Sequence, residues 1–238
     1  MEKFFVHPSL MESSAGYDLF SLTHFIYLLV CTLVIVFFSV WYVKSDQKRR
    51  QSIRWLVASI VLLSQVIRIS ASNITIGFHL SELPLHLCGM SVFLVSYHAW
   101  RPNARLSDAI YMLSLPGAIV SLLFLDWSHQ YQLNIFTLQS WIVHLMMAVY
   151  VIMLLAGHDL HPQRKNILAV ATIFALYASG IYVFNKLWNT NFLFLNYPAP
   201  GFPMETFSSW LGNPGYILIL LGILLSLWTI MYGFRKTS

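Results

Sequence analysis

The sequence predicts an all-α, polytopic membrane protein built as a single bundle of about seven transmembrane helices. Of its 238 residues, 58% are hydrophobic and only 10% are charged, whereas about a quarter of the residues in a soluble domain carry charge. Several apolar runs approach the ~20 residues that a helix needs to cross the hydrocarbon core. They lack the alternation of barrel strands, so helices are the spanning structure that pairs the backbone amides.

Seven apolar runs define the expected spans. In chain order they cover residues 19–43, 53–71, 83–100, 108–125, 136–157, 167–188 and 215–233. Residues 1–18 form an outer N-terminal segment before them, and residues 189–214 form the longest loop. Four prolines oppose a regular helix in that loop, which is expected either to fold over the outer mouth of the bundle as a lid or to rest exposed on the headgroups. We expect one integral membrane domain over residues 1–238.

Basic residues predict the orientation of the bundle. They gather in alternate connections and after the last span: Lys44, Lys48, Arg49, Arg50, Arg54, Arg101, Arg105, Arg164, Lys165, Arg235 and Lys236. The intervening connections contain no Lys or Arg. The positive-inside rule therefore places the N-terminus outside and the C-terminus in the cytoplasm, as expected for a multi-pass protein of the cell membrane. The same placement argues against a nucleic-acid partner despite the net charge of +5.

The two cysteines, Cys31 and Cys88, both lie inside apolar runs. A structural disulfide or a zinc site is therefore not expected, and no cofactor is predicted. The first twenty residues lack the apolar stretch of a signal peptide, so no cleavage is expected. Trp, Tyr and Phe residues near the span ends are interpreted as interfacial anchors.

Polar side chains inside the spans gather toward the outer ends. An ionisable group in a span is costly and usually faces the bundle interior or water. The residues concerned are Gln65, Arg68, His86, Cys88, Gln139, Ser140, His144, Asn185 and Lys186. Their distribution predicts a polar pocket that opens toward the outer leaflet or the outer face, while the cytoplasmic halves are expected to be plainer.

Within this pocket, Cys88 is the candidate reactive centre and His144 its candidate activator. If helices start at Leu83 and Phe136, Cys88 lies roughly 7–8 Å and His144 roughly 12 Å below the surface, which are similar depths. Both groups can meet only if they face inward. Ser140 precedes His144 by four residues on one helix face, so its hydroxyl is expected to reach the imidazole.

The expected start of the third span affects the chemistry of the thiol. Ser81 or Glu82 is interpreted as the N-cap, with Pro84 in the first turn. Cys88 would then lie one to two turns into the helix, where the macrodipole is weak, and formation of its thiolate would depend on a histidine. His86 points about 200° away from Cys88 on a helix, so both cannot face one small site.

Plainer interpretations stay open at this point. A lone cysteine in a span is more often a small buried apolar residue, and Arg68 can simply snorkel to the outer headgroups. Cys31 has no histidine or helix cap near its depth and is not proposed as a reactive group.

The string Leu83-Pro84-Leu85-His86-Leu87-Cys88 resembles the YwaF family of bacterial integral membrane proteins, which is related to the vertebrate family named transmembrane protein 164. The stretch from Asn185 through Asn191 to Leu195 resembles the asparagine-rich segment of that family before its last span. The stretch Gly212–Tyr216 is similar to the start of that span, although the family's tryptophans are missing here. His144 falls where the family has a histidine.

The resemblance implies a function and assigns roles. The vertebrate relatives are similar to membrane acyltransferases that act on phospholipids, with a cysteine and a histidine as the implicated pair, here Cys88 and His144. We expect an acyltransferase or lipid hydrolase acting on the acyl chains of membrane phospholipids. The expected substrate-binding residues are Arg68 or Lys186 for the phosphate, Asn185 or Asn191 for the oxyanion, and His86, Gln139 and Ser140 in the pocket.

Other functions use the same polar cluster. A non-enzymatic transporter or binding protein for a small polar solute would use it as a vestibule, although the sequence shows no inverted repeat or matched pair of broken helices. A small structural bundle that binds another membrane protein is the third interpretation. The oligomeric state stays open.

Overall fold

The structure, a computed structural model, describes residues 3–11, 16–125, 127–128, 130–199 and 203–233. Every regular element in these ranges is helical. Six helices are long and apolar enough to cross a membrane, and a seventh, α3 (Leu87–Trp100), is apolar but shorter. The chain consists of two compact units, residues 1–161 and 162–238. The prediction of an all-α polytopic membrane protein is confirmed, whereas the orientation and the single-domain organisation stay predictions.

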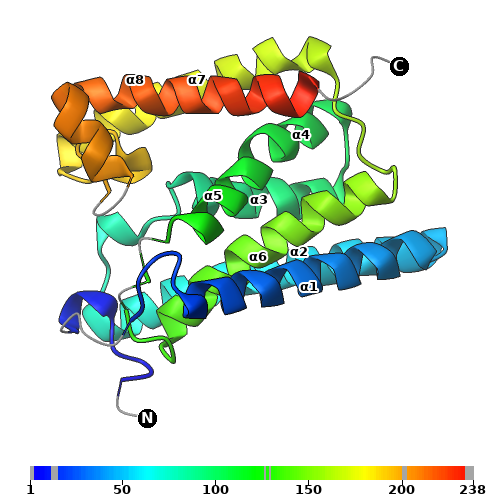
Figure 1. The fold of residues 1–238 in the computed structure, drawn as a ribbon, viewed down its shortest axis with the longest axis horizontal. Coiled ribbons are helices and arrows are strands. Elements are labelled where there is room, and N and C mark those ends of the chain that lie inside the picture. Colours follow the sequence, from blue (N-terminus) through cyan, green and yellow to red (C-terminus); the bar gives the residue numbers. More distant parts are fainter. Residues whose placement is uncertain (1–2, 12–15, 126, 129, 200–202, 234–238) are drawn as a thin grey trace. The chain divides into compact units, whose positions relative to one another are not determined.

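The first unit is organised around α6 (Figure 1). Its other main helices are α1 (Leu22–Lys44), α2 (Gln47–Ile76), α3, α4 (Ala104–Ala109) and α5 (Leu115–Leu123). The helix α6 (Ile135–Ala156) packs against α1, α2, α3 and α5, and most of its residues are buried. Side chains around most of the circumference of α6 therefore face other helices.

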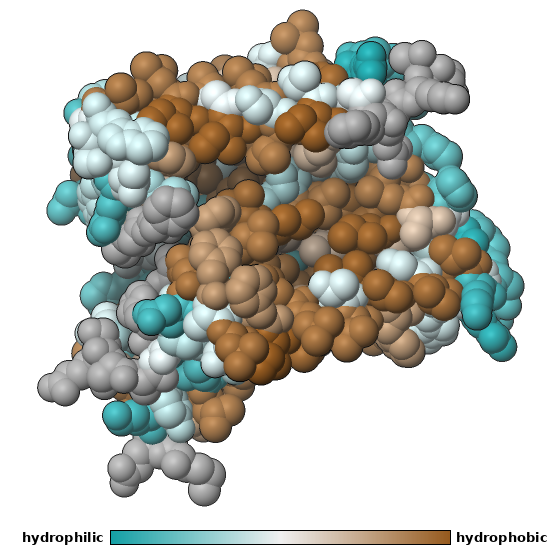
Figure 2. Space-filling view, in the orientation of Figure 1, coloured by the Kyte–Doolittle hydropathy of each residue, from teal (hydrophilic) through white to brown (hydrophobic). Residues whose placement is uncertain are grey.

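The outward faces of this unit are apolar. Leu29, Leu33 and Phe37 of α1 are more than half exposed although they are large hydrophobic residues. Figure 2 shows hydrophobic residues over most of the visible helical surface, with hydrophilic residues gathered toward the helix ends. An exposed apolar surface of this kind is typical of contact with lipid.

The connection between α2 and α3 folds back into the helix bundle of the first unit. Gly77, at φ 78°, ends α2, and a single 3-10 turn, Leu80–Glu82, follows. Glu82 forms an ion pair with Arg68 at 3.3 Å. Arg68 lies eight residues before the end of α2, which is about 12 Å along the helix axis. The segment 77–86 therefore lies beside the last turns of α2 instead of continuing outward.

The expected helix start near Leu83 is wrong. The helix α3 begins at Leu87 with His86 as its N-cap residue, so Pro84 lies outside it. Leu83 is extended, with φ −60° and ψ 144°, because the ring of the following proline disfavours the helical conformation at the residue before it. Gly89 then passes close to this segment, since a Cβ there would lie 2.5 Å from the carbonyl oxygen of Pro84.

Two other spans differ in their limits. The helix α2 extends beyond the predicted 53–71 at both ends, and Asp46 caps it by accepting a hydrogen bond from the Arg49 amide at 2.9 Å. The charged residues of this first turn lower the local hydropathy, so the predicted span does not include the turn, but they do not prevent helix formation. The predicted span 108–125 starts earlier, at Ala104, and contains a π-helical segment, Ile110–Ser114. Pro116 follows it, and proline cannot donate the next helical hydrogen bond.

The ends of α1, α2 and α6 are joined by a polar cluster that the sequence did not reveal. Tyr42 donates a hydrogen bond to Asp159 at 2.6 Å, and Arg50 forms an ion pair with the same carboxylate at 3.3 Å. Arg50 also donates to the carbonyl of Gly157 at 2.9 Å. These contacts hold the three helix ends together. This end of the bundle, which is expected to be cytoplasmic, therefore has more polar contacts than expected.

The second unit contains α7 (Ile167–Trp188) and α8 (Met204–Gly233). The limits of α7 coincide with the predicted span. The helix α8 starts within the predicted loop 189–214. Pro198 and Pro203 precede its first turn, whereas Pro214 lies inside the helix. Its backbone is interrupted at Gly212 and Asn213. Arg164 donates to the carbonyl of Tyr232 at 2.8 Å, which joins the start of α7 to the end of α8.

Gly157→Ala should destabilise the first unit. A Cβ at this position would lie 2.6 Å from the ring of Tyr42, which is completely buried, and overpacking of this kind costs about 1–3 kcal/mol. Thermal unfolding of the purified protein in detergent measures the effect. Gly180→Ala on α7 is the matched control, because no atom apart from the neighbouring backbone of α7 lies within 4 Å of the added Cβ. Equal melting temperatures for the two variants would contradict the account of this contact.

Candidate functional site

Cys88 is the second residue of α3. Its side chain is half-buried, whereas Cys31 is buried. The prediction that Cys88 lies one to two turns into the helix is wrong because the helix starts later than expected. The backbone N–H groups of a first turn have no partner within the helix, and the positive end of the macrodipole favours negative charge there. The start of α3 therefore supports a thiolate more directly than the sequence suggested.

His144 lies in the third turn of α6 and is buried. Its Nδ1 is 2.7 Å from the carbonyl oxygen of Ser140. Since a carbonyl can only accept, Nδ1 carries the proton and donates, and Nε2 is the nitrogen that can accept a proton. The expected contact from the Ser140 hydroxyl is wrong, because that hydroxyl donates to the carbonyl of Phe136 at 2.9 Å.

Trp127, from the connection between α5 and α6, lies flat against His144. The two ring centroids are 5.1 Å apart and the ring planes differ by 16°. Trp127 is buried and belongs to an aromatic cluster with Trp141 and Tyr27. The sequence interpretation treated such tryptophans as interfacial anchors. Trp127 instead packs on the proposed catalytic histidine, 17 positions away along the chain.

A polar group of three residues lies at the segment before α3. Glu82 contacts Arg68 with one carboxylate oxygen and His7 with the other, the latter at 3.7 Å. The ring of His7 also packs edge-on against Phe136 at the start of α6, with 4.9 Å between centroids. The sequence singled out Arg68 but missed His7 and identified Glu82 only as a possible cap.

The N-terminal segment is held against this region by Asn134. Its side-chain amide donates to the carbonyls of Lys3 and Val6, both at 2.8 Å. The amide of Ile135 donates to the carbonyl of Phe4 at 2.9 Å. Residues 3–7 therefore cover the start of α6 and bring His7 to Glu82.

Arg68 connects these observations. It lies on α2 and is joined to the segment that leads into α3 by its ion pair with Glu82. The helices α3 and α6 also pack directly on each other and on α2. The structure brings together the elements that bear Arg68, His86, Cys88 and His144.

Gln139 and Ser140 belong to the buried part of α6. Asn185, Lys186 and Asn191 belong to the second unit, where Lys186 is exposed. The side chain of Asn185 donates to the carbonyl of Phe192 at 2.9 Å and accepts from the Thr190 hydroxyl at 2.8 Å. These contacts organise the turn after α7, and the substrate-binding roles of the three residues stay predictions.

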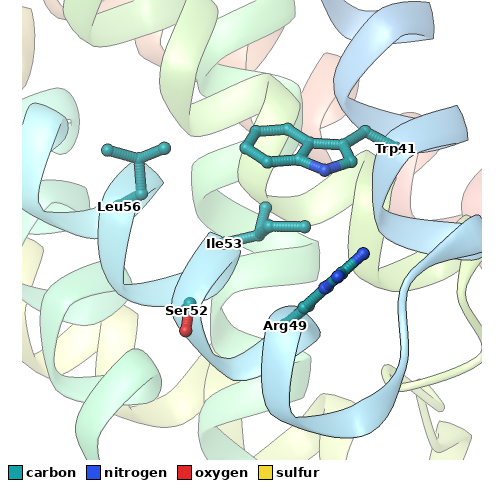
Figure 3. A pocket seen from close by; sticks show the side chains of 5 residues that line it. All are labelled: Trp41, Arg49, Ser52, Ile53 and Leu56. Atoms are coloured by element: carbon teal, nitrogen blue, oxygen red, sulfur yellow. The ribbon is translucent and has the colours of Figure 1, made fainter.

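A groove of about 510 Å³ lies between α1 and α2, far from these residues (Figure 3). It is lined by Trp41, Arg49, Ser52, Ile53 and Leu56. Arg49 is 19 residues before Arg68 on α2, which is about 28 Å along the helix. The groove shares no lining residue with the predicted pocket.

The helices and their buried polar groups define a multi-pass integral membrane protein with a half-buried thiol at a helix start and a buried imidazole on a neighbouring helix. The model of the TMEM164 family matches residues 19–232, and the chain belongs to that family. No curated protein and no solved structure matches it. The resemblance to relatives of transmembrane protein 164 is confirmed, and the assignment to the YwaF family stays a prediction.

The His7 contacts predict a pH-dependent stability. Burial is the main cause that holds the pKa of His7 below its ordinary value of 6.5, and the positive charges of Arg68 and His79 act in the same direction against the carboxylate of Glu82. As the pH falls through 6.5, the unfolded chain takes up this proton before the folded chain does. The contribution of His7 to stability is therefore complete above pH 6.5 and decreases below it.

His7→Gln should flatten this decrease between pH 7 and pH 5, as measured by thermal unfolding across that range. His161→Gln, at an exposed position, is the control and should follow the unmodified protein. A His7→Gln curve parallel to that of the unmodified protein would contradict the proposed role of His7.

Proposed function

We propose that this protein is a membrane-embedded acyltransferase or lipid hydrolase that acts on phospholipid acyl chains through Cys88 and His144. The observation that carries the proposal is the position of Cys88, half-buried in the first turn of α3. Membership of the TMEM164 family over residues 19–232 supports it. We place the reaction in the outer leaflet of the cell membrane, in agreement with the predicted orientation.

The path of the segment before α3 supports a polar site at this depth. Non-helical backbone within a membrane is tolerated where protein buries it or where it lines a water-filled cavity. Residues 77–86 bring the backbone around Leu83 and Pro84 beside the outer part of α2, where Glu82 meets Arg68. A phospholipid ester lies just below the headgroups, so its carbonyl carbon can approach a thiol in the first turn of α3.

The chemistry consists of two half-reactions. Cys88 sulfur attacks the acyl carbonyl carbon while its proton passes to Nε2 of His144, and the lysophospholipid oxygen leaves with the proton from His144. An acyl thioester remains on Cys88. The hydroxyl of an acceptor, or water in a hydrolase, then attacks this thioester. His144 takes that proton and returns it to the Cys88 sulfur.

Arg68 is the proposed contact for the lipid phosphate. A guanidinium matches two phosphate oxygens in a bidentate geometry. Glu82 occupies one side of this guanidinium at 3.3 Å, and about one third of the Arg68 side chain is exposed. A phosphate would therefore share Arg68 with Glu82 or take its place, which places the glycerol ester toward α3.

Acyl exchange on labelled phospholipid tests the proposal. We expect Cys88→Ser to reduce turnover to near background because the thiolate is the better nucleophile, and His144→Ala to reduce it by about 10²–10⁴-fold. Turnover is followed with purified protein in liposomes.

Cys31→Ala is the matched control. Cys31 is buried in the cluster around Trp127 and Trp141 and has no role in the mechanism, so this variant should keep turnover within about twofold. The mechanism is wrong if Cys88→Ser and His144→Ala both retain full acyl exchange. Solute uptake into vesicles that is unaffected by Cys88→Ala would support a transporter instead.

A further inference from the structure

The indole N–H of Trp127 has no hydrogen-bond partner among the residues that the structure describes, although it is buried. The side chain is only 7% exposed. Leaving such a donor unpaired costs about 1–3 kcal/mol, and a buried donor of this kind in a native structure calls for an explanation. A ligand that supplies an acceptor during function is one such explanation.

Trp127 lies beside the proposed catalytic histidine. Its ring is stacked on His144, with 5.1 Å between the centroids and 16° between the planes. The indole N–H bond lies in the plane of its own ring, so it points sideways from the stack and not into the imidazole. One edge of the imidazole is occupied by the Ser140 carbonyl at Nδ1. A group that receives or gives a proton at Nε2 therefore lies beside the imidazole on which the Trp127 ring is stacked.

We propose that the Trp127 indole N–H donates a hydrogen bond to the acyl carbonyl oxygen of the substrate and stabilises the oxyanion that forms when Cys88 attacks. This inference rests on the proposed function. The asparagines that the sequence analysis assigned to the oxyanion both have side chains engaged in the second unit, where Asn185 contacts Phe192 and Asn191 contacts Tyr197. Trp127 supplies an unengaged donor in the unit that contains Cys88 and His144.

The proposed role of Trp127 involves no proton transfer. The carbonyl π electrons shift onto the oxygen as the carbon–sulfur bond forms, and they return when the carbon–oxygen bond of the leaving alcohol breaks. The N–H of Trp127 keeps its proton throughout. Preorganised donors of this type contribute most where charge develops in a site that excludes water.

Trp127→Phe isolates the donor because phenylalanine keeps an aromatic ring against His144 and lacks the N–H. We expect kcat for acyl exchange to fall by about 10²–10³-fold, with KM and melting temperature close to those of the unmodified protein. Trp141→Phe is the matched control. Trp141 is 8% exposed, belongs to the same cluster and also has an unpaired indole N–H among the described residues, but its ring is not stacked on His144. The Trp141→Phe variant should keep kcat within about twofold of that of the unmodified protein.

A second measurement does not depend on turnover. With ¹⁵N-labelled tryptophan, the indole proton of Trp127 should shift downfield when an ester phospholipid is added to the Cys88→Ser protein. An ether phospholipid, which has no acyl carbonyl, should leave it unchanged. Trp127→Phe identifies the resonance.

The outcomes separate this inference from the proposed function. If Trp127→Phe retains full kcat, or if Trp141→Phe loses as much, the oxyanion role of Trp127 is wrong. Equal shifts with ester and ether lipids would overturn it as well. When Cys88→Ser and His144→Ala lose turnover in the same assay, these results leave the Cys88–His144 mechanism intact. A fully active Cys88→Ser protein overturns both.

Discussion

The ion pair between Arg68 and Glu82 is the constraint on which the candidate site depends. It joins a residue two turns below the end of α2 to the segment that leads into α3. With Glu82 held at this depth, α3 starts at Leu87, inside the bundle. Cys88 is therefore placed in a first turn, where the backbone amides have no partner within the helix, and not in the middle of a span.

Much of the fold could be predicted from hydropathy alone. The limits of α7 coincide with the predicted 167–188, because an apolar run bounded by polar residues on both sides has few alternatives in lipid. The start of α3 could not be predicted in this way. Leu83 and Leu85 are as apolar as helical residues, and the extended backbone before Pro84 depends on a conformational preference and on the long-range contact of Glu82, which hydropathy does not record.

The sequence predicted only those site residues that are unusual within a span because of their residue type. Arg68 and His144 are conspicuous because charged or titratable side chains are rare within spans. Trp127 and His7 were missed, since each acts through a partner distant in sequence: Trp127 stacks on His144, and His7 reaches Glu82. The position of residues 3–7 could not be predicted either, because it depends on Asn134, whose side-chain amide donates to two carbonyls of that segment. An unpaired indole N–H becomes visible only when the packing around it is known.

The proposed mechanism requires that Cys88 becomes acylated, and peptide mass spectrometry detects this intermediate. The protein is incubated with a phospholipid that carries an isotopically labelled acyl chain, without an acceptor, and quenched in acid. We expect the labelled acyl mass on the peptide containing Cys88, its removal by neutral hydroxylamine, and its accumulation in His144→Ala only at a strongly reduced rate. If the protein turns over phospholipid while its Cys88 peptide carries no acyl group at any time, Cys88 is not the nucleophile and the mechanism is wrong.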